Sequence, residues 1–212
     1  MLELNHLHYA PATSKTSILT GVSLKASIGQ PVIVAGASGS GKTSLLEVIS
    51  GLSLPSSGNI RWKGKKISRK KLRSLCGMVF QFPERHFLGL TVRQELRLGH
   101  RRFSEERQAK VLNQVGLNNV PCSMPPERLS GGQQRRLAMA VQIDRGADVL
   151  LLDEPTAGLD WSVRLDMLAL MSDIARDKVL IVVTHEPYLF NDWDCNRYHL
   201  RDGKLTPFTK LQ

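Results

Sequence analysis

Hydrophobic and polar positions alternate at the start of the chain, and later the apolar residues gather into short unbroken runs. Leu2, Leu4, Leu7 and Tyr9 keep the two-residue period of a strand with one buried face. Three later runs are apolar throughout, which is typical of parallel strands that are covered on both faces. These runs are residues 31–35, 149–152 and 179–183, and further strands are expected at 16–24, 59–62 and 76–80. The pattern predicts an α/β fold with two sheet layers.

Polar capping residues mark the starts of two helices in the middle of the chain. Thr91 is expected to cap a helix that reaches Gly99, and Ser104, followed by two glutamates, is expected to cap the next one. These two helices predict an inserted helical subdomain. A further helix is expected over residues 162–176, and its residues with the spacing of a core face are Leu165, Leu168 and Met171.

Composition indicates one globular domain without a membrane anchor. With 212 residues, of which 42% are hydrophobic, the chain is long enough to bury a proper core. Its apolar runs are far too short to cross a bilayer, and the first ten residues show neither a basic start nor an apolar signal core. Cys76, Cys122 and Cys195 lie far apart and match no metal-ligand spacing, which favours structural thiols in a reducing compartment.

A glycine-rich segment lies between the strand at 31–35 and the helical pattern that follows it. It fits G-x-x-x-x-G-K-[ST], in which backbone N–H groups converge on phosphate oxygens and the helix start adds partial positive charge. Lys42 would place its ammonium between the two terminal phosphates, and the Thr43 hydroxyl would occupy one position of an octahedral Mg²⁺. The implied ligand is a nucleoside triphosphate with Mg²⁺. The residues expected to bind it are Gly36, Ala37, Ser38, Gly39, Ser40, Gly41, Lys42, Thr43 and Ser44.

Two carboxylates end the apolar run at 149–152, where a buried parallel strand would deliver them to the ligand-binding edge of a sheet. Asp153 is suited to contact Mg²⁺ through water. Glu154 is placed to orient and deprotonate the water that attacks the γ-phosphate. An isolated Asp-Glu pair would more simply end a strand, but together with Lys42 the pair favours ATP hydrolysis.

Residues 129–133 read Leu-Ser-Gly-Gly-Gln and lie between the glycine-rich segment and the acidic strand end. In this order the three motifs resemble the ATP-binding cassette (ABC) family over nearly the whole chain. The resemblance implies that the Ser130 hydroxyl and the backbone of Gly131 and Gly132 grip the γ-phosphate bound to the opposite subunit. The enzyme should therefore work as a dimer, either with itself or with a paralogous ATPase.

Four further roles are implied by the same resemblance. Gln81 resembles the glutamine that touches Mg²⁺ and the attacking water, and His185 resembles the switch histidine that contacts the γ-phosphate. Asp160 resembles the loop residue that crosses the dimer interface. Tyr9 resembles the aromatic residue that stacks on adenine, although its alternating segment also fits a residue on a sheet face. The expected catalytic residues are Glu154, His185, Gln81 and Lys42.

The implied fold is that of a P-loop NTPase, with a RecA-like parallel sheet, an antiparallel β subdomain and an inserted helical subdomain that bears the signature. Residues 1–83 and 146–212 would form the nucleotide-binding core, and residues 84–145 would form the helical signature subdomain. All 212 residues would make up a single ABC ATPase domain.

The segment that begins at Gln81 points to one branch of the family. Residues 81–88 read Gln-Phe-Pro-Glu-Arg-His-Phe-Leu and resemble energy-coupling-factor transporters, in which a groove near residues 82–90 receives a coupling helix of the membrane subunit. The chain departs from that pattern at His86, where glutamine is usual, and at Phe87 and Leu88, whose order is reversed. It looks closer to cyanobacterial and plastid members. The implied function is to power import of a metal ion or vitamin through integral membrane subunits, from the cytoplasmic or stromal side.

The chain carries a net charge of +10 at pH 7, and eight of its basic residues lie within residues 61–73. Such a stretch suits nucleic acid, anionic lipid or a solvated hairpin, and we favour a solvated or membrane-facing surface. Fewer than 90 residues separate the glycine-rich segment from the signature, which leaves no room for the insertions of DNA-handling relatives. No nucleic-acid partner is therefore expected. The alternative function is a soluble ABC ATPase that assists iron-sulfur cluster or translation-related assembly.

Overall fold

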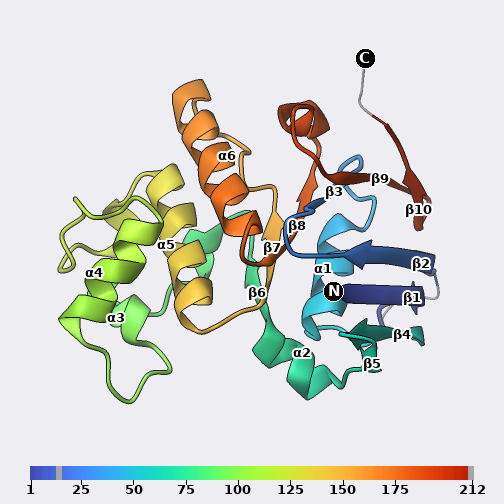
Figure 1. Cartoon of the computed structure of the whole chain (residues 1–212), viewed down its shortest axis with the longest axis horizontal. Helices are drawn as coiled ribbons and strands as arrows, with labels where there is room; N and C mark the ends of the chain where they lie inside the picture. Colours follow the sequence, from blue (N-terminus) through green and yellow to red (C-terminus); the bar gives the residue numbers. More distant parts are fainter. Residues whose placement is uncertain (13–15, 210–212) are drawn as a thin grey trace.

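A computed structural model describes residues 1–12 and 16–209 of the chain. Its centre is a six-stranded sheet with the strand order β10-β9-β3-β8-β7-β6 (Figure 1). All neighbours in this order are parallel except β10 and β9, which pair antiparallel at one edge. The strands are β3 (Val32–Ala35), β6 (Cys76–Val79), β7 (Val149–Asp153), β8 (Val179–Thr184), β9 (Asn196–Arg201) and β10 (Lys204–Pro207).

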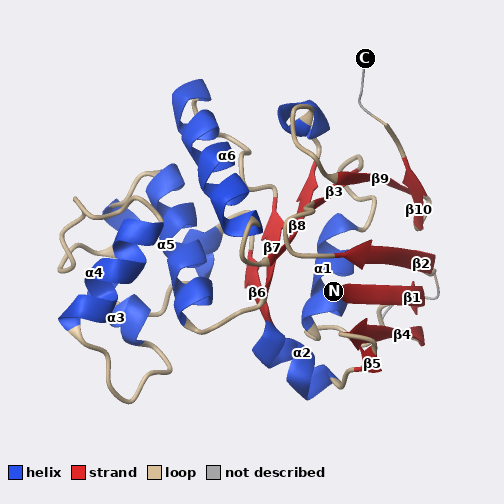
Figure 2. Ribbon diagram, viewed as in Figure 1, coloured by secondary structure: helices blue, strands red, loops and turns tan. Residues whose placement is uncertain are grey.

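A second sheet has four antiparallel strands in the order β2-β1-β4-β5. Strand β1 (Leu2–Tyr9) pairs with both β2 (Leu19–Ala26) and β4 (Ser57–Trp62), and the short β5 (Lys65–Lys66) forms one edge. Helix α1 (Lys42–Ser50) lies between this sheet and the central one, as Figure 2 shows. The resemblance to a P-loop NTPase with an antiparallel β subdomain is therefore confirmed.

Both faces of the central sheet are buried, because alternate residues of each strand point to opposite sides. Leu150 and Leu152 belong to one hydrophobic cluster, which includes the residues of the helical layer. Leu151 belongs to a second cluster, which includes α1 and the antiparallel sheet. All three side chains are fully buried. Burial on both faces explains why the sequence of this strand is apolar without interruption.

The helical layer gathers on one side of the central sheet (Figure 1). Its helices are α3 (Val92–Arg97), α4 (Glu105–Gln114), α5 (Gly131–Asp144) and α6 (Trp161–Ala175). The two expected caps are confirmed, since the Thr91 hydroxyl accepts from the Gln94 N–H at 3.2 Å and the Ser104 hydroxyl accepts from the Arg107 N–H at 3.1 Å. Within the described residues, no helix is long and apolar enough to span a bilayer.

The expected strands are confirmed, with shifts of a few residues at their ends, whereas β5, β9, β10 and α2 (Arg69–Leu75) were not predicted. Strand β9 has only one buried residue, Leu200, and therefore lacks an apolar run. Thr206 and Pro207 belong to β10 but are exposed, in agreement with a chain end that lies away from the core. Sheet pairing rather than apolar burial defines this edge.

One core prediction was wrong, because Leu165 is 48% exposed. Leu168 is half-buried and packs against the first hydrophobic cluster, and Met171 is fully buried. Since successive helical residues are rotated by about 100°, Leu165 points about 120° away from Met171 around the helix axis. The residues of α6 that are buried are Met167, Leu170, Met171 and Ala175.

The basic stretch at 61–73 forms the β4–β5 hairpin and α2, and all eight basic residues are exposed. Arg69 and Arg73 donate through Nε to the Gly51 carbonyl at 2.8 and 3.1 Å, where they complement the negative end of α1. Among the described parts of the chain, no carboxylate pairs with this stretch. The solvated or membrane-facing interpretation stays a prediction.

None of the three cysteines, which all lie within the described residues, forms a disulfide. Burial, with a smaller effect of Asp148, raises the pKa of Cys76 to about 12. The Cys122 sulfur accepts a hydrogen bond from Gln108 Nε2 at 2.8 Å. The neutral, half-buried Cys76 thiol packs against the second hydrophobic cluster, in agreement with a structural role.

Replacement of two residues on the same helix tests the orientation of α6. Met171→Ala should lower the free energy of unfolding by about 2–5 kcal/mol, because it leaves a cavity in the core. Leu165→Ala should change it by about 0.5 kcal/mol or less, because the side chain is largely in solvent. Urea unfolding followed by circular dichroism measures both, and equal losses would contradict the observed orientation.

Candidate active site

The glycine-rich loop follows β3 and ends where α1 begins, so the free backbone N–H groups of the first helical turn lie at the loop. Gly39 and Gly41 have φ angles of 79° and 98°, in the left-handed region that favours glycine. Space is also restricted. A Cβ at Gly36 would lie 2.6 Å from Ser40 Oγ, and one at Gly41 would lie 2.7 Å from Ile18 Cγ2. The loop is therefore a cradle that larger residues would fill.

A cavity of about 470 Å³ opens over this cradle. The ends of β3, β6, β7 and β8 bring polar groups to it, although these groups lie far apart in the sequence. The lining residues are Ile18, Ser38, Gly39, Gly41, Lys42, Thr43, Ser44, Gln81, Asp153, Glu154 and His185. Most of the expected site residues are thus brought together at the carboxyl edge of the central sheet.

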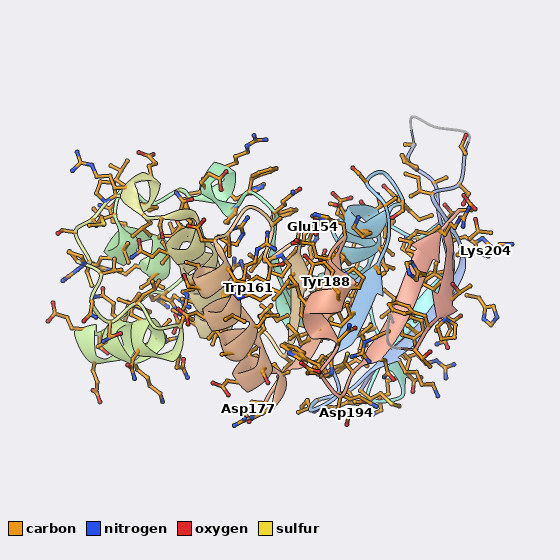
Figure 3. All side chains as sticks on the ribbon, turned by 90° about the horizontal axis from the view of Figure 1, so that it is seen from above. Glu154, Trp161, Asp177, Tyr188, Asp194 and Lys204 are labelled. Atoms are coloured by element: carbon orange, nitrogen blue, oxygen red, sulfur yellow. The ribbon has the colours of Figure 1, made fainter. Side chains whose placement is uncertain are left out.

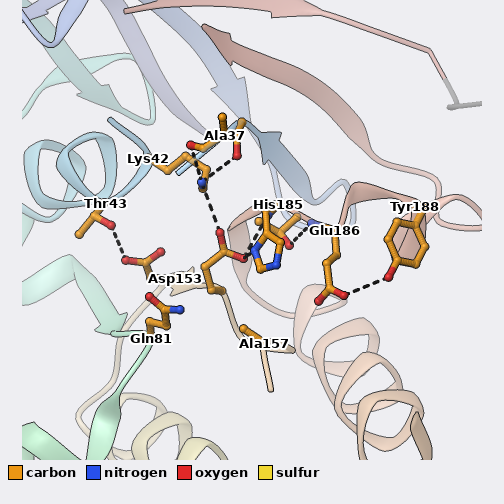
Figure 4. Close-up of polar contacts among 12 residues, drawn as sticks. Ala37, Lys42, Thr43, Gln81, Asp153, Ala157, His185, Glu186 and Tyr188 are labelled. Carbon is orange, nitrogen blue, oxygen red and sulfur yellow. Dashed lines mark hydrogen bonds and ion pairs between the residues drawn. The ribbon is translucent and has the colours of Figure 1, made fainter. Parts of the chain in front are cut away.

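Lys42 supplies the cation of this cavity and is only 7% exposed. Its Nζ donates to the carbonyls of Gly36 and Ala37 at 2.8 and 3.1 Å and lies 3.4 Å from Glu154 Oε1. Figure 4 shows the ammonium between the loop carbonyls and the strand end. A buried ammonium needs such partners, and the oxygens of a phosphate would serve it equally well.

Asp153 and Thr43 meet at the other side of the cavity, where Thr43 Oγ1 donates to Asp153 Oδ2 at 2.7 Å. Burial raises the pKa of the Asp153 carboxyl, and the hydrogen bond from Thr43 opposes this shift. Gln81 lies beside them in Figure 4. Hydroxyl, carboxylate and amide oxygens are the donors that Mg²⁺ prefers, so this set fits a magnesium ion.

Glu154 has an unusual backbone, with a φ of 48° in the left-handed region. Its N–H donates to the Val183 carbonyl at 2.9 Å, which ties the residue to β8. Its Oε2 accepts from the His185 N–H at 3.1 Å and lies 2.7 Å from His185 Nδ1. A left-handed glutamate costs of order 1–3 kcal/mol, and such strain is concentrated at functional sites. The backbone thus holds the carboxylate against both Lys42 and His185.

Three residues of the loop, Gly36, Ala37 and Ser40, do not line the cavity. They support the loop instead. Two of their carbonyls accept from Lys42, and the Ser40 N–H donates to the Ala37 carbonyl at 3.1 Å. Their direct contact with phosphate stays a prediction.

Tyr9 also lies outside the lining residues. Its hydroxyl is 3.4 Å from Ser53 Oγ, and its side chain packs against the second hydrophobic cluster. Its carbonyl accepts from the Ile18 N–H at 2.8 Å, and Ile18 does line the cavity. Tyr9 is thus connected to the cavity through Ile18, and adenine stacking stays a prediction.

The signature segment lies at a different cavity. The Ser130 hydroxyl accepts from the Gln133 N–H at 3.3 Å, and Gln133 Oε1 accepts from the Ser130 N–H at 2.9 Å, so the two form a capping box at the start of α5. This second cavity has a volume of about 350 Å³. It is lined by Ser130, Gly131 and Gly132 together with Gln81, Arg135 and Asp160, among others. Within one chain, the signature therefore does not face Lys42.

Comparisons with known proteins agree with this geometry. A family model described as "ABC transporter" matches residues 19–157. The chain belongs to the ABC transporter family. Among the relatives of this ABC protein is ABC transporter I family member 11, chloroplastic, from Arabidopsis thaliana, which is 37% identical over 201 residues. That match covers 87% of the present chain and 72% of the relative.

Further relatives narrow the kind of ABC protein. The energy-coupling factor transporter ATP-binding protein EcfA2 of Lactobacillus gasseri is 35% identical, with 84% of this chain and 67% of EcfA2 covered. The solved structure of cbiO1 from Clostridium perfringens, part of the ABC transporter complex cbiONQ, is 27% identical with a TM-score of 0.85, covering 97% of this chain and 86% of cbiO1.

A second solved structure is the ATP-binding cassette MJ0796, a dimer in a post-hydrolysis state bound to ADP and Pi. It is 25% identical, with a TM-score of 0.83 and full coverage of both chains. The ABC protein described here is therefore an ATP-hydrolysing, ATP-binding subunit of the transporter type, related to energy-coupling-factor and cbiO ATPases.

Sequence reasoning missed several polar residues that surround the ABC site. Arg135 on α5 is buried, and Arg164 on α6 pairs with Glu186 at 2.8 Å. Ile18, on the cavity wall, was also missed. Arginines on helical segments are ordinarily solvent-facing, so their burial was not visible in the sequence.

Replacement of the cradle lysine tests the assignment of the phosphate site. Lys42→Ala should abolish ATP binding, because it removes the cation at the cavity and leaves Glu154 without its charged partner. Fluorescent ATP-analogue titration measures the affinity, and Lys65→Ala, at an exposed lysine on β5, serves as the matched control. Tight ATP binding by a folded Lys42→Ala protein would contradict the assignment.

Proposed function

We propose that this ABC ATPase powers the import of a metal ion or a vitamin through separate membrane subunits, on the cytoplasmic or stromal face of a membrane. The observation that carries the proposal is the convergence of Lys42, Glu154 and His185 over the glycine cradle, together with Gln81, which lines the same cavity and directly precedes the segment 82–90. The relatedness to an energy-coupling-factor transporter ATPase supports a role in transport, and the relatedness to a chloroplastic ABC protein supports the stromal location.

Hydrolysis is assigned to the groups around the position of the γ-phosphate. Glu154 would take the proton of the attacking water, while Lys42 and His185 would stabilise the negative charge that develops on the phosphoryl oxygens. Thr43 and Asp153, helped by Gln81, would hold Mg²⁺. The bound magnesium ion would neutralise phosphate charge. The products are ADP and phosphate.

The other half of each catalytic site is proposed to come from a second subunit. Because the signature and Lys42 line different cavities, one chain cannot offer both to the same nucleotide. A facing subunit would present its signature hydroxyl and the start of its α5 to the γ-phosphate. The dimeric neighbour bound to ADP and Pi supports this arrangement. Two such subunits would close around two MgATP and reopen after hydrolysis, and closure would drive transport.

The membrane subunit is proposed to dock on the segment 82–90, at the border between the core and the helical signature subdomain of residues 84–145. Phe82 is 45% exposed, Leu88 is 81% exposed and Leu90 is 78% exposed. The backbone of the segment is fixed by α3, because the buried Glu95 carboxylate accepts from the N–H groups of Leu88 and Gly89 at 2.8 and 2.7 Å. A fixed apolar surface of this kind suits a protein partner.

His86, where the chain departs from the energy-coupling-factor pattern, has a structural role beside that surface. Its ring stacks on Phe80 with centroids 4.3 Å apart. Phe80 in turn lines a cavity of about 610 Å³ that Met78, Arg73 and Arg145 also line. Phe87 is half-buried and packs against the first hydrophobic cluster, so its reversal with Leu88 leaves the leucine in solvent. We propose that this cavity and the exposed leucine together receive the membrane subunit.

Replacement of the proposed base tests the chemistry. Glu154→Gln should retain ATP binding but lower turnover by about 100- to 10,000-fold, since the amide has the same shape and cannot accept the proton. Phosphate release measures turnover, and ATP-analogue titration confirms that the site is still occupied. Near-normal turnover in this variant would remove Glu154 from the role.

A charge introduced on the docking segment should weaken binding of the membrane subunit without changing basal ATP hydrolysis. Leu88→Asp and Leu90→Asp should reduce co-purification of a membrane subunit by about tenfold or more, because a carboxylate would be desolvated in an apolar contact. Basal ATP hydrolysis should stay within about twofold. Leu165→Asp, at another exposed leucine, is the matched control. Equal recovery of the partner with all three variants would exclude this surface.

The experiment that decides the function is to tag Glu154→Gln in its native cell, solubilise membranes gently with MgATP and identify co-purifying proteins by mass spectrometry. A stoichiometric membrane protein with several spans would establish the transport function and indicate the cargo. Recovery of soluble scaffold proteins alone would overturn it in favour of the assembly ATPase. A second, paralogous ATPase in equal amount would indicate a heterodimer.

A further inference from the structure

The segment 157–160, which links the strand end at Glu154 to α6, is held by two arginines from opposite sides. Arg135 donates through Nη2 to the Ala157 carbonyl at 2.6 Å. Arg164 donates through Nε to the Leu159 carbonyl at 2.8 Å. Between these contacts Gly158 is exposed, and Asp160 beyond them is exposed as well. Each arginine also reaches a second loop of the catalytic site.

Arg135 extends from α5, five residues after the signature serine, toward the loop that carries Gln81. The same Nη2 lies 3.5 Å from the Gln81 carbonyl oxygen. The residue is 7% exposed, and among the described residues its Nε has no hydrogen-bond partner. Burial lowers the pKa of Arg135, while the charge of Glu84 in the docking segment opposes that shift. The guanidinium therefore joins the signature helix, the 157–160 segment and the start of the docking segment.

Arg164 makes the corresponding link on the other side. Its Nη1 donates to Glu186 Oε1 at 2.8 Å, and both side chains are largely buried. Glu186 follows His185 directly, and its Oε1 also accepts from the Tyr188 hydroxyl at 3.0 Å (Figure 4). Its backbone N–H donates to Thr184 Oγ1 at 2.9 Å. The ion pair thus joins the 157–160 segment to the loop that carries the switch histidine.

The residue type suits this double role. A guanidinium presents several N–H donors in one plane and can serve two acceptors at once, whereas an ammonium acts as a point charge. Each arginine binds a carbonyl of the 157–160 segment and also an acceptor in a second loop, so its contacts do more than satisfy one carbonyl oxygen. In Figure 3 Glu154, Trp161 and Tyr188 lie near the middle of the molecule, with Trp161 at the start of α6. The clamped segment lies between the first two of these residues in the chain.

We propose that Arg135 and Arg164 are positioning residues that fix the segment 157–160 between the loops of Gln81 and His185. This inference rests on the proposed dimer, in which Asp160 crosses to the other subunit. The Ala157 N–H donates to the Glu154 carbonyl at 3.2 Å, so the segment is also tied to the base. A shift of either loop when one nucleotide is hydrolysed would therefore move the residues presented to the second site. The two arginines would couple the two ATP sites.

Lysine at each position tests the proposal, because it keeps the charge but cannot serve two acceptors in one plane. In Arg135→Lys and Arg164→Lys, kcat should fall about tenfold, which corresponds to the loss of one charged hydrogen bond in the active arrangement. The Kd for an ATP analogue should stay within about twofold, because neither arginine lines the nucleotide cavity. The Hill coefficient for ATP turnover should fall toward 1 in both variants.

The matched control is Arg136→Lys, on the same helix. Arg136 donates to the Val115 carbonyl at 3.0 Å and contacts Asp166, away from the catalytic loops. It should keep kcat and the Hill coefficient of the unmodified protein. Thermal unfolding of all variants separates a folding defect from a positioning defect, and Arg164→Lys carries the test if Arg135→Lys fails to fold.

Three outcomes would overturn the proposal. They are an unchanged kcat in a folded lysine variant at either position, an equal loss in Arg136→Lys, and a Hill coefficient of 1 in the unmodified enzyme at normal turnover. Glu154→Gln measured in parallel distinguishes these outcomes from failure of the proposed function. If the unmodified protein and Glu154→Gln hydrolyse ATP equally, the base assignment is wrong. If only Glu154→Gln is impaired, the base stands and the clamp does not.

Discussion

Burial of the parallel strands on both faces is the constraint on which the rest of the structure depends. Residues within β3, β7 and β8 are buried, so these strands can present polar side chains to a ligand only at or beyond their ends. Because the three strands are parallel neighbours, those ends lie at one edge. The glycine-rich loop, Asp153, Glu154 and His185 are adjacent for this reason, although they lie far apart in the sequence.

The charges at that edge explain what the site can hold. One ammonium, Lys42, faces two carboxylates, Asp153 and Glu154, within a set of largely buried groups. A triphosphate would add more negative charge than a single lysine can balance. The N–H groups at the start of α1 supply part of the deficit, and a divalent cation at Thr43 and Asp153 would supply the rest. Affinity for the nucleotide and for the metal ion should therefore depend on each other.

The sequence could predict the features of the site that need a particular residue type in a short segment. The left-handed φ angles at Gly39 and Gly41, and the apolar run before Asp153, both depend on local residues and are visible in a motif. It could not predict which faces of longer helices are buried, as Leu165 illustrates, because that depends on packing between distant elements. The same reason hid Arg135 and Arg164, because both bind backbone carbonyl oxygens, which any sequence would provide.

The groups proposed to act on one nucleotide are divided between two cavities of the chain. The cavity over the glycine-rich loop is lined by Glu154 but not by the signature segment, and the second cavity is lined by the signature segment but not by the glycine-rich loop. The gap between them within one chain is bridged by Gln81, which lines both. A substitution of Gln81 would therefore alter both the cavity proposed to bind the nucleotide and the cavity proposed to face the second subunit.

The left-handed backbone of Glu154 opposes folding stability to the proposed catalytic role of this residue. The conformation costs of order 1–3 kcal/mol, which is a noticeable share of the marginal stability of a domain, and a glycine would remove this cost. The chain instead keeps a carboxylate there and restrains it through Val183 and Ala157. The folded protein is consequently less stable than it would be with a glycine at this position. The strain that lowers its stability lies at the residue proposed to activate water for ATP hydrolysis.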